Sequence, residues 1–184
     1  DHYSTASICG PNSKKILKKI FPDKDFSDDA FPHMSYQNGK IDEINCRIMR
    51  ISFTGELSYE INIESKYGKS LWEKCIEAGK EFKITPYGTE TMHLLRAEKG
   101  FIIVGQDTDG TMTPIDLQMD WIVSKRKYDF IGKRSLYRSD TIREDRKQLV
   151  GLLTDDPNEI LEEGAQIVSD LSLIHISEPT RPRI

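Results

Sequence analysis

Residues 57–63, LSYEINI, alternate apolar and polar side chains more clearly than any other part of this 184-residue chain. Leu, Tyr and Ile occupy the odd positions, whereas Ser58, Glu60 and Asn62 occupy the even ones. Successive side chains of a β-strand point to opposite faces of its sheet, so this period of two predicts a half-buried strand. The carboxylate of Glu60 is then expected on the polar face, away from the core.

Strand and helix patterns follow one another on both sides of this segment. Apolar, β-branched or alternating runs predict strands at 3–8, 44–53 and 148–153, and apolar residues at helical spacing predict helices at 14–20, 67–79 and 89–99. The dipeptide Asn38-Gly39, which favours a two-residue hairpin turn, follows a short strand predicted at 33–37. This order indicates an α+β chain with a ferredoxin-like β-α-β-β-α portion.

Composition and charge exclude several classes of protein. Lys and Arg number 26 against 30 Asp and Glu, and a net charge of −4 argues against a nucleic-acid partner. No run approaches the ~20 apolar residues of a membrane span. The three cysteines have no CxxC spacing, so we read Cys9, Cys46 and Cys75 as buried structural thiols in a reducing, cytoplasmic environment.

The sequence lacks the short motifs that identify common catalytic sites. The few histidines show no zinc-binding spacing, so no metal site is predicted, and His93 is read as an ordinary helical histidine. Neither a phosphate-binding loop nor a GxGxxG fingerprint occurs, so no nucleotide site is predicted. Short motifs alone therefore indicate no catalytic machinery.

The two ends of the chain differ from its body. The chain opens at Asp1 with no charged or apolar leader, and we expect it to be the interior of a longer protein. Residues 171–184, LSLIHISEPTRPRI, differ in character from the preceding text and resemble translated sequencing-adapter sequence. We expect them to be a non-native tail; the alternative is a natural terminal strand.

Glu60 and Phe53 are the candidate ligand-binding residues. A carboxylate can accept two parallel N–H hydrogen bonds from a flat amino-heterocycle, and an aromatic ring can stack on that heterocycle. Both features suit a pterin, whose 2-amino and N3–H groups form a two-donor edge. The alternative is an exposed glutamate on the polar face of a strand.

Four segments in order resemble the folate-binding aminomethyltransferase family, the glycine-cleavage T-protein fold. FTGELSYE at 53–60 resembles its YTGExGxE signature, and CGP at 9–11 resembles the QGP that begins a helix. TMHLLRAEKG at 91–100 resembles DxLRLEAG, and the Thr-Pro at 113–114 with DFIGK at 129–133 resembles TPxEAGLGW…DFIGREAL. The resemblance covers roughly residues 1–153.

Longer stretches such as GTETMHLLRAEKGFIIVGQDTDG at 88–110 resemble the sarcosine oxidase α-subunit branch of this family. This implies a chain truncated at both ends: an aminomethyltransferase-like folate-binding region at 1–140 without its N-terminal part, and the start of a C-terminal β-barrel domain at 147–170. It also implies that the other sarcosine oxidase subunits are partners. FAD, FMN and NAD would belong to the parent complex rather than to this fragment.

The resemblance also implies roles for individual residues. Glu60 matches the glutamate that binds the pterin edge, Phe53 matches an aromatic residue that lines the folate pocket, and Met92 stands where the family has a folate-contacting arginine. The family's essential aspartate lies upstream, so no catalytic acid or base is assigned here. The implied enzyme transfers the one-carbon unit of oxidised sarcosine to tetrahydrofolate, giving 5,10-methylenetetrahydrofolate, and the isolated fragment is expected to be inactive.

Three alternatives remain at this point. The first is a free-standing aminomethyltransferase that acts on a lipoyl-bound methylamine, although Met92 replaces the arginine that this reading expects. The second is a relative that assists iron–sulfur assembly, which the missing Cys and Gln at 51–56 argue against. The third is a non-catalytic folate-binding scaffold.

Overall fold

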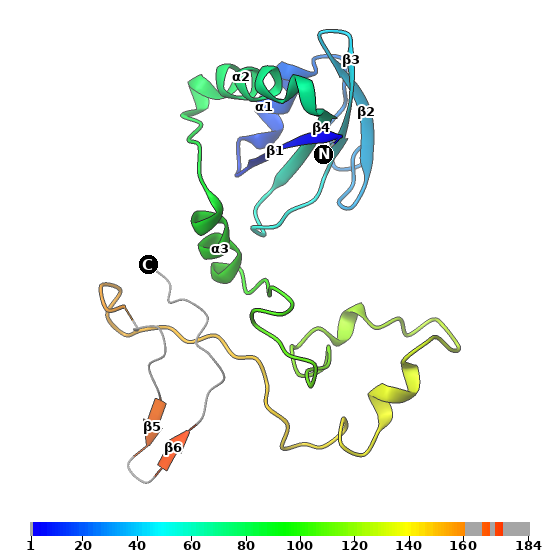
Figure 1. Ribbon diagram of the computed structural model, residues 1–184, viewed down its shortest axis with the longest axis vertical. Helices are drawn as coiled ribbons and strands as arrows, with labels where there is room; N and C mark the ends of the chain where they lie inside the picture. The colour runs from blue at the N-terminus through cyan, green and yellow to red at the C-terminus, as the bar shows by residue number, and fades with distance from the viewer. Residues whose placement is uncertain (1, 161–166, 170–171, 175–184) are drawn as a thin grey trace. The chain divides into compact units, whose positions relative to one another are not determined.

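The computed structural model describes residues 2–160, 167–169 and 172–174 (Figure 1), and the chain divides into two units. The first unit runs to Phe101, and the second begins at Ile102. The helices and strands of the first unit are, in order, β1 (Tyr3–Cys9), α1 (Ser13–Ile20), β2 (Tyr36–Ile41), β3 (Ile44–Met49), β4 (Ser58–Glu64), α2 (Gly68–Gly79) and α3 (Thr89–Glu98).

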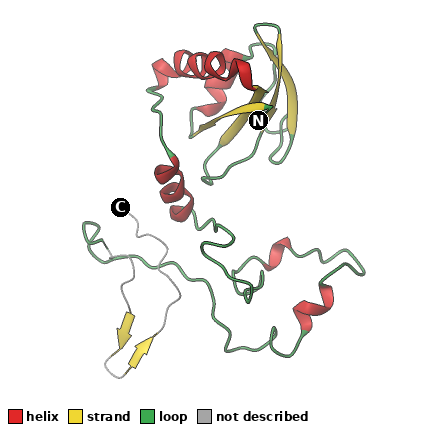
Figure 2. Cartoon of the chain, in the orientation of Figure 1, coloured by secondary structure: helices red, strands yellow, loops and turns green. Residues whose placement is uncertain are grey.

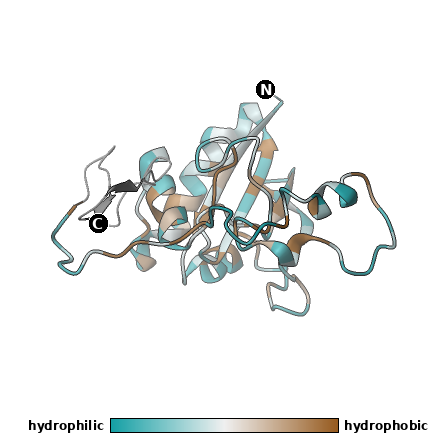
Figure 3. Ribbon diagram, turned by 90° about the horizontal axis from the view of Figure 1, so that it is seen from below, coloured by the Kyte–Doolittle hydropathy of each residue, from teal (hydrophilic) through white to brown (hydrophobic). Residues whose placement is uncertain are grey.

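The strands of the first unit form one antiparallel sheet of order β1-β4-β3-β2. β4 is the strand quoted at the outset, and it pairs with β1 on one edge and with β3 on the other. Hydrophobic and hydrophilic residues follow one another along these strands (Figure 3). The predicted strand at 57–63 and the α+β class are therefore confirmed.

The core of the first unit lies between this sheet and the helices α1 and α2. Tyr59, Ile61 and Ile63 of β4 are fully buried, as is Leu17 of α1, and Leu71 of α2 is nearly so. Burying side chains of this size contributes about 1.5–3 kcal/mol each. The opposite face of the sheet, which carries the polar residues of β4, is not covered by these helices.

One predicted turn is wrong, because Asn38-Gly39 lies inside β2 instead of ending it. The hairpin turns at Asp42-Glu43, where both residues have positive φ (47° and 66°) as a two-residue hairpin turn requires. Gly39 serves a different purpose: a Cβ there would lie 3.0 Å from the ring of Phe21. The order between α1 and α2 therefore contains one strand more than a β-α-β-β-α run.

The described part of the second unit has little regular structure (Figure 2). Its described residues form two short 3₁₀ helices, Asp120–Ile122 and Lys133–Tyr137, and a two-stranded ribbon of β5 (Ile167–Ser169) and β6 (Ser172–Ile174). The strand predicted at 148–153 is absent. Of the predicted barrel start and tail, residues 161–166, 170–171 and 175–184 lie outside the described part of the chain.

A buried ion pair between Asp116 and Arg146 joins two distant segments of the second unit. Asp116 is 1% exposed and accepts hydrogen bonds from Nε and Nη2 of Arg146 at 2.8 and 2.7 Å. The backbone N–H and hydroxyl of Thr113 donate to the same carboxylate, at 2.8 and 2.9 Å. The N–H of Leu149 also donates to the Asp116 carbonyl oxygen, at 2.8 Å, which joins the two segments through the backbone as well.

We expect Asp116→Asn to loosen the second unit in a pH-dependent way. Hydrogen bonds from Arg146 hold the pKa of Asp116 at about 2, below its ordinary value of 3.8 and against the opposing effect of burial. The stabilisation is therefore complete above about pH 4 and is lost as the pH falls through 2. Losing a charged hydrogen-bond partner costs about 2 kcal/mol, or roughly thirtyfold in local opening.

Hydrogen exchange of the peptides around 111–118 and 146–149 measures this opening. Asp120→Asn, which removes an exposed carboxylate 3.7 Å from Lys125, is the matched control. Equal exchange in Asp116→Asn and the wild type at pH 7 would contradict the assignment, and the difference should vanish near pH 2.

Gly55→Ala should destabilise the first unit. Gly55 has φ of +78°, and a Cβ there would lie 2.7 Å from Cβ and Cγ of Lys99, near the base of that side chain. Left-handed backbone in a residue other than glycine costs on the order of 1–3 kcal/mol before the clash is added. Gly88→Ala is the control, because Gly88 has extended backbone and nothing within 4 Å. Thermal unfolding should show a clear loss for Gly55→Ala alone; equal midpoints would refute the close approach.

Candidate functional site

Glu60 lies half-buried on the open face of the sheet. In the strand register it stands opposite Ser7 of β1 and Met49 of β3. Burial raises the pKa of its carboxyl group. Within the described chain no side chain or backbone group forms a hydrogen bond or ion pair with this carboxylate. Glu60 is thus a partly desolvated acceptor whose hydrogen-bonding capacity is unused.

A group of hydroxyl and thiol side chains flanks Glu60 on the β1 side. The Oγ atoms of Ser7 and Ser58 are 3.3 Å apart. Sγ of Cys9 lies 2.9 Å from the hydroxyl of Tyr87, which comes from the segment between α2 and α3. Burial is the main cause that raises the pKa of Tyr87, followed by its hydrogen bond with Cys9. This contact links the segment between α2 and α3 to the C-terminal end of β1, because Cys9 lies two residues after Ser7 in that strand.

Phe53 lies against α3 and keeps part of its ring accessible. Phe53 is 43% exposed, and its ring lies beside that of His93 in a tilted arrangement, with centroids 6.4 Å apart and planes at 32°. Two residues further along the loop, Gly55 packs against Lys99, whose Nζ also pairs with Glu56 at 3.0 Å. The loop at 53–56 therefore follows one side of α3 from His93 to its C-terminal end.

The structure shows no hydrogen bond, ion pair or ring contact between any two of the three predicted site residues in the described chain. Phe53 reaches the helix that carries Met92, but its ring contact is with His93, the next residue. Consecutive helical residues point about 100° apart, so Met92 and His93 face different directions. Among the described residues no hydrogen bond, ion pair or ring contact joins Glu60 to Phe53 or to Met92.

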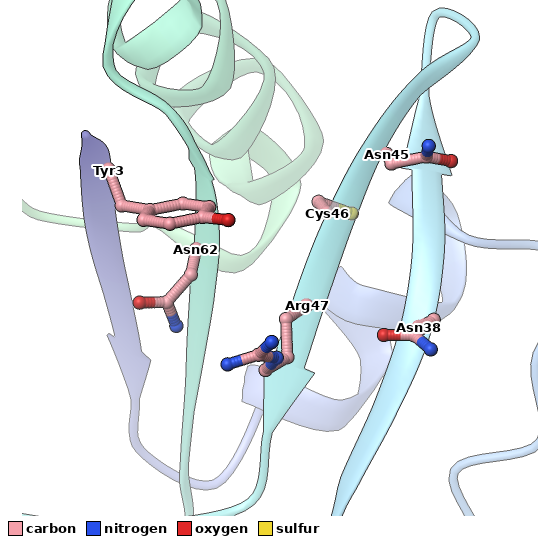
Figure 4. A pocket seen from close by; sticks show the side chains of 6 residues that line it. All are labelled: Tyr3, Asn38, Asn45, Cys46, Arg47 and Asn62. Atoms are coloured by element: carbon pink, nitrogen blue, oxygen red, sulfur yellow. The ribbon is translucent and has the colours of Figure 1, made fainter.

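A polar hollow of about 410 Å³ lies over the sheet, and Figure 4 shows the side chains that line it; the strand register puts Asn62 and Arg47 of this hollow on the same face as Glu60. The residues that line it come from all four strands: Tyr3, Asn38, Asn45, Cys46, Arg47 and Asn62. Arg47 stands directly opposite Asn62, in the register position next to Glu60 on this face. We call this feature the Arg47 hollow.

Sequence analysis missed several of these residues. The cysteines were expected to be buried structural thiols, and for Cys46 and Cys75 this is confirmed: burial raises the pKa of each to about 11. Cys9 is different, because it is partly exposed and its Sγ forms a hydrogen bond with the hydroxyl of Tyr87. The even-numbered positions of β4 were a signal for Asn62, but nothing in the sequence paired Arg47 with it.

The described residues contain neither a metal-binding cluster nor a helix that could span a membrane. Residues 2–160 and the two short strands contain no cluster of His, Cys, Asp or Glu that could hold a metal ion. No helix in the same ranges is both long and apolar enough to cross a bilayer.

Comparison with known proteins places this chain in a family. The sarcosine oxidase subunit alpha of Corynebacterium sp. (strain P-1) is 56% identical over 171 residues, which are 92% of this chain and 18% of that protein. The subunit alpha of Rhizobium meliloti (strain 1021) is 39% identical over 92% of this chain and 17% of its own length. The aminomethyltransferase of Halothermothrix orenii is 33% identical over 75% of this chain and 38% of its own length.

The chain thus spans about a fifth of the length of the sarcosine oxidase subunits that it matches. The domain family described as the GCVT N-terminal domain matches residues 1–127, which include β1 to β4, Glu60 and the Arg47 hollow. The chain belongs to the GCVT N-terminal domain family.

Proposed function

We propose that this chain is the folate-binding part of a sarcosine oxidase α subunit. In this role it helps to transfer the one-carbon unit of oxidised sarcosine to tetrahydrofolate, giving 5,10-methylenetetrahydrofolate. The similarity to named sarcosine oxidase subunits and to an aminomethyltransferase supports this function. Sarcosine oxidation, the flavin and NAD sites and the other subunits would belong to the longer protein and its complex.

The observation that carries this proposal is the unpaired, half-buried carboxylate of Glu60. A pterin presents its 2-amino and N3–H donors side by side, and a carboxylate can accept both. Partial burial strengthens such hydrogen bonds, because the local dielectric is lower than that of water. Glu60 makes no competing contact within the described chain, so it is free to take up this edge.

Other residues of the first unit fit the same ligand. The accessible part of the Phe53 ring offers a surface for stacking, at a place held by His93 and α3. Met92 of α3 would supply apolar contact where relatives of the aminomethyltransferase type are expected to carry an arginine.

The chain's own contribution is binding and orientation. Tetrahydrofolate, when bound, supplies the two nitrogens that accept the one-carbon unit. Glu60 would fix the pterin edge and Phe53 its plane, which holds those nitrogens at a constant position relative to the sheet. No residue of this chain is assigned as a general acid or base.

A free-standing aminomethyltransferase is the second candidate function. The relative from Halothermothrix orenii supports it at 33% identity over 75% of this chain. The sarcosine oxidase subunits match more of the chain at higher identity, and Met92 departs from the arginine of the aminomethyltransferase pattern. The first candidate is therefore favoured.

Glu60→Gln in the full-length protein should weaken tetrahydrofolate binding by about tenfold or more. The substitution keeps the size of the side chain but removes the charge and one of two acceptors, and a hydrogen bond to a charged group contributes about 1.5–3 kcal/mol. Titration calorimetry measures the affinity. Glu64→Gln is the matched control, because Glu64 lies on the same face of β4 but is exposed and paired with Lys66. An unchanged affinity in Glu60→Gln would remove the central site assignment.

Tetrahydrofolate affinity should also fall on acidification earlier than an ordinary carboxylate predicts. Burial raises the pKa of Glu60, so protonation replaces an acceptor by a donor at a higher pH than for an exposed glutamate. Calorimetry between pH 7 and pH 4 tests this, with Glu60→Gln as the reference that should lack the transition. The same pH profile in both proteins would assign the titration to another group.

A further inference from the structure

The open face of the sheet is shielded at the end where β4 begins. Along the polar positions of β4 the exposure rises from one end to the other: Ser58 is buried, Glu60 and Asn62 are half-buried, and Glu64 is exposed. The helices α1 and α2 pack on the opposite face, so they do not account for this burial. Another segment of the first unit therefore covers the open face beside Ser58 and Glu60.

Contacts with β1 place Tyr87 at this end of the face. Its hydroxyl lies 2.9 Å from Sγ of Cys9, and a hydrogen bond with Ser7 lowers its pKa against the larger effect of burial. In the strand register Cys9 stands opposite Ser58, and Ser7 stands opposite Glu60. Directly opposite side chains of an antiparallel pair have Cβ atoms about 5 Å apart. The hydroxyl of Tyr87 is therefore held next to the two shielded positions of β4.

Tyr87 also lies on the side of Glu60 that faces Phe53. Its hydroxyl contacts the last residue of β1, which pairs with the first residue of β4. This row of the sheet lies between Glu60 and the loop that carries Phe53. α3 begins two residues after Tyr87, and His93 in its second turn contacts the Phe53 ring. Tyr87 and Phe53 therefore border the same end of the open face, where the unpaired carboxylate of Glu60 lies.

The ring of Tyr87 is not used in the packing of the first unit. Tyr87 is half-buried, but it does not belong to the hydrophobic core. Within the described chain its ring makes no contact with another aromatic ring or with a cation. A tyrosine whose hydroxyl is fixed by hydrogen bonds presents its ring with little conformational freedom left to lose. Such a ring suits the packing of a flat heterocycle.

We propose that Tyr87 is a second aromatic residue of the ligand site. Held by Cys9 and Ser7, its ring shields the Glu60 carboxylate on the β1 side and packs against the heterocycle that Glu60 binds. This inference rests on the proposed function and adds a binding residue to it. Shielding strengthens the hydrogen bonds from the pterin to Glu60, because water is excluded from them. The ring contact adds dispersion attraction and fixes the plane of the heterocycle.

Two substitutions separate the ring of Tyr87 from its hydroxyl. Tyr87→Leu removes both and should weaken tetrahydrofolate binding in the full-length protein by about tenfold. Tyr87→Phe keeps the ring and loses only the hydrogen bonds that hold it, so it should weaken binding by no more than about threefold. Titration calorimetry measures both affinities. Tyr36→Leu is the matched control and should bind as the wild type does, because Tyr36 is an exposed tyrosine of β2 in the same row of the sheet, two strands from Glu60.

The pH dependence of binding gives a readout that a merely structural role of Tyr87 would not change. Burial is the cause that raises the pKa of Glu60. The charged or titratable side chains of the surrounding elements do not contribute to this shift: Cys9 of β1, Arg47 of β3, Glu64 of β4, Glu56 of the loop, Tyr87, and His93 and Lys99 of α3. Tyr87→Leu admits water to Glu60 and should move the acid loss of tetrahydrofolate binding to lower pH, whereas Tyr87→Phe should leave it in place.

Three results would overturn the inference. These are a wild-type affinity in Tyr87→Leu, equal losses of affinity in Tyr87→Leu and Tyr87→Phe, and an acid transition that Tyr87→Leu does not shift. Equal losses would reduce the role of Tyr87 to the contact of its hydroxyl with β1. If Glu60→Gln weakens tetrahydrofolate binding in the same preparations, only this inference fails; if Glu60→Gln binds as the wild type does, the proposed function fails as well.

Discussion

The structure of the first unit depends on the two-sided pairing of β4. This strand exchanges backbone hydrogen bonds with β1 on one edge and β3 on the other, so its register fixes which residues of three strands share a face. A shift by one residue would bring Tyr59, Ile61 and Ile63 out of the core and place Glu60 and Asn62 in it. The burial of those three side chains therefore also determines where the candidate ligand-binding residues lie.

The loop before β4 extends this constraint to α3. Thr54 is buried, and Gly55 adopts a left-handed backbone that permits close contact with Lys99. As a result Phe53 is held against His93 instead of extending into solvent. One continuous segment, 53–60, thus carries an aromatic ring at one end and an unpaired carboxylate at the other, and both ends are fixed by packing.

The sequence predicts those parts of the molecule where a single local pattern decides the outcome. Alternation at 57–63 identifies β4 and the outward position of Glu60 because burial of one face overrides other preferences. The hairpin turn predicted at Asn38-Gly39 is wrong because Gly39 does not form a turn. It lies in β2, where the close approach of the Phe21 ring, distant in sequence, leaves no room for a side chain. The apolar run at 148–153 forms no strand, and its side chains at Val150, Leu152 and Leu153 stay exposed, so no buried face stabilises a strand there. Pairings such as Cys9 with Tyr87 or Arg47 with Asn62 join residues whose spacing follows no period, so no local pattern contains them.

The open face of the sheet carries opposite hydrogen-bonding characters in neighbouring positions. Glu60 is an acceptor without a donor, whereas Arg47 and Asn62, one position along the strands, are donors without an acceptor. Had these groups paired with one another, the hydrogen-bonding groups of this face would be satisfied within the protein, and the face would gain little from binding a ligand. Leaving Glu60 and the Nδ2 of Asn62 unpaired costs stability, because such partly or fully buried polar groups lose water without gaining partners, whereas Arg47 is exposed. Such a cost is characteristic of binding sites, and at Glu60 it points to a ligand that donates a pair of N–H groups.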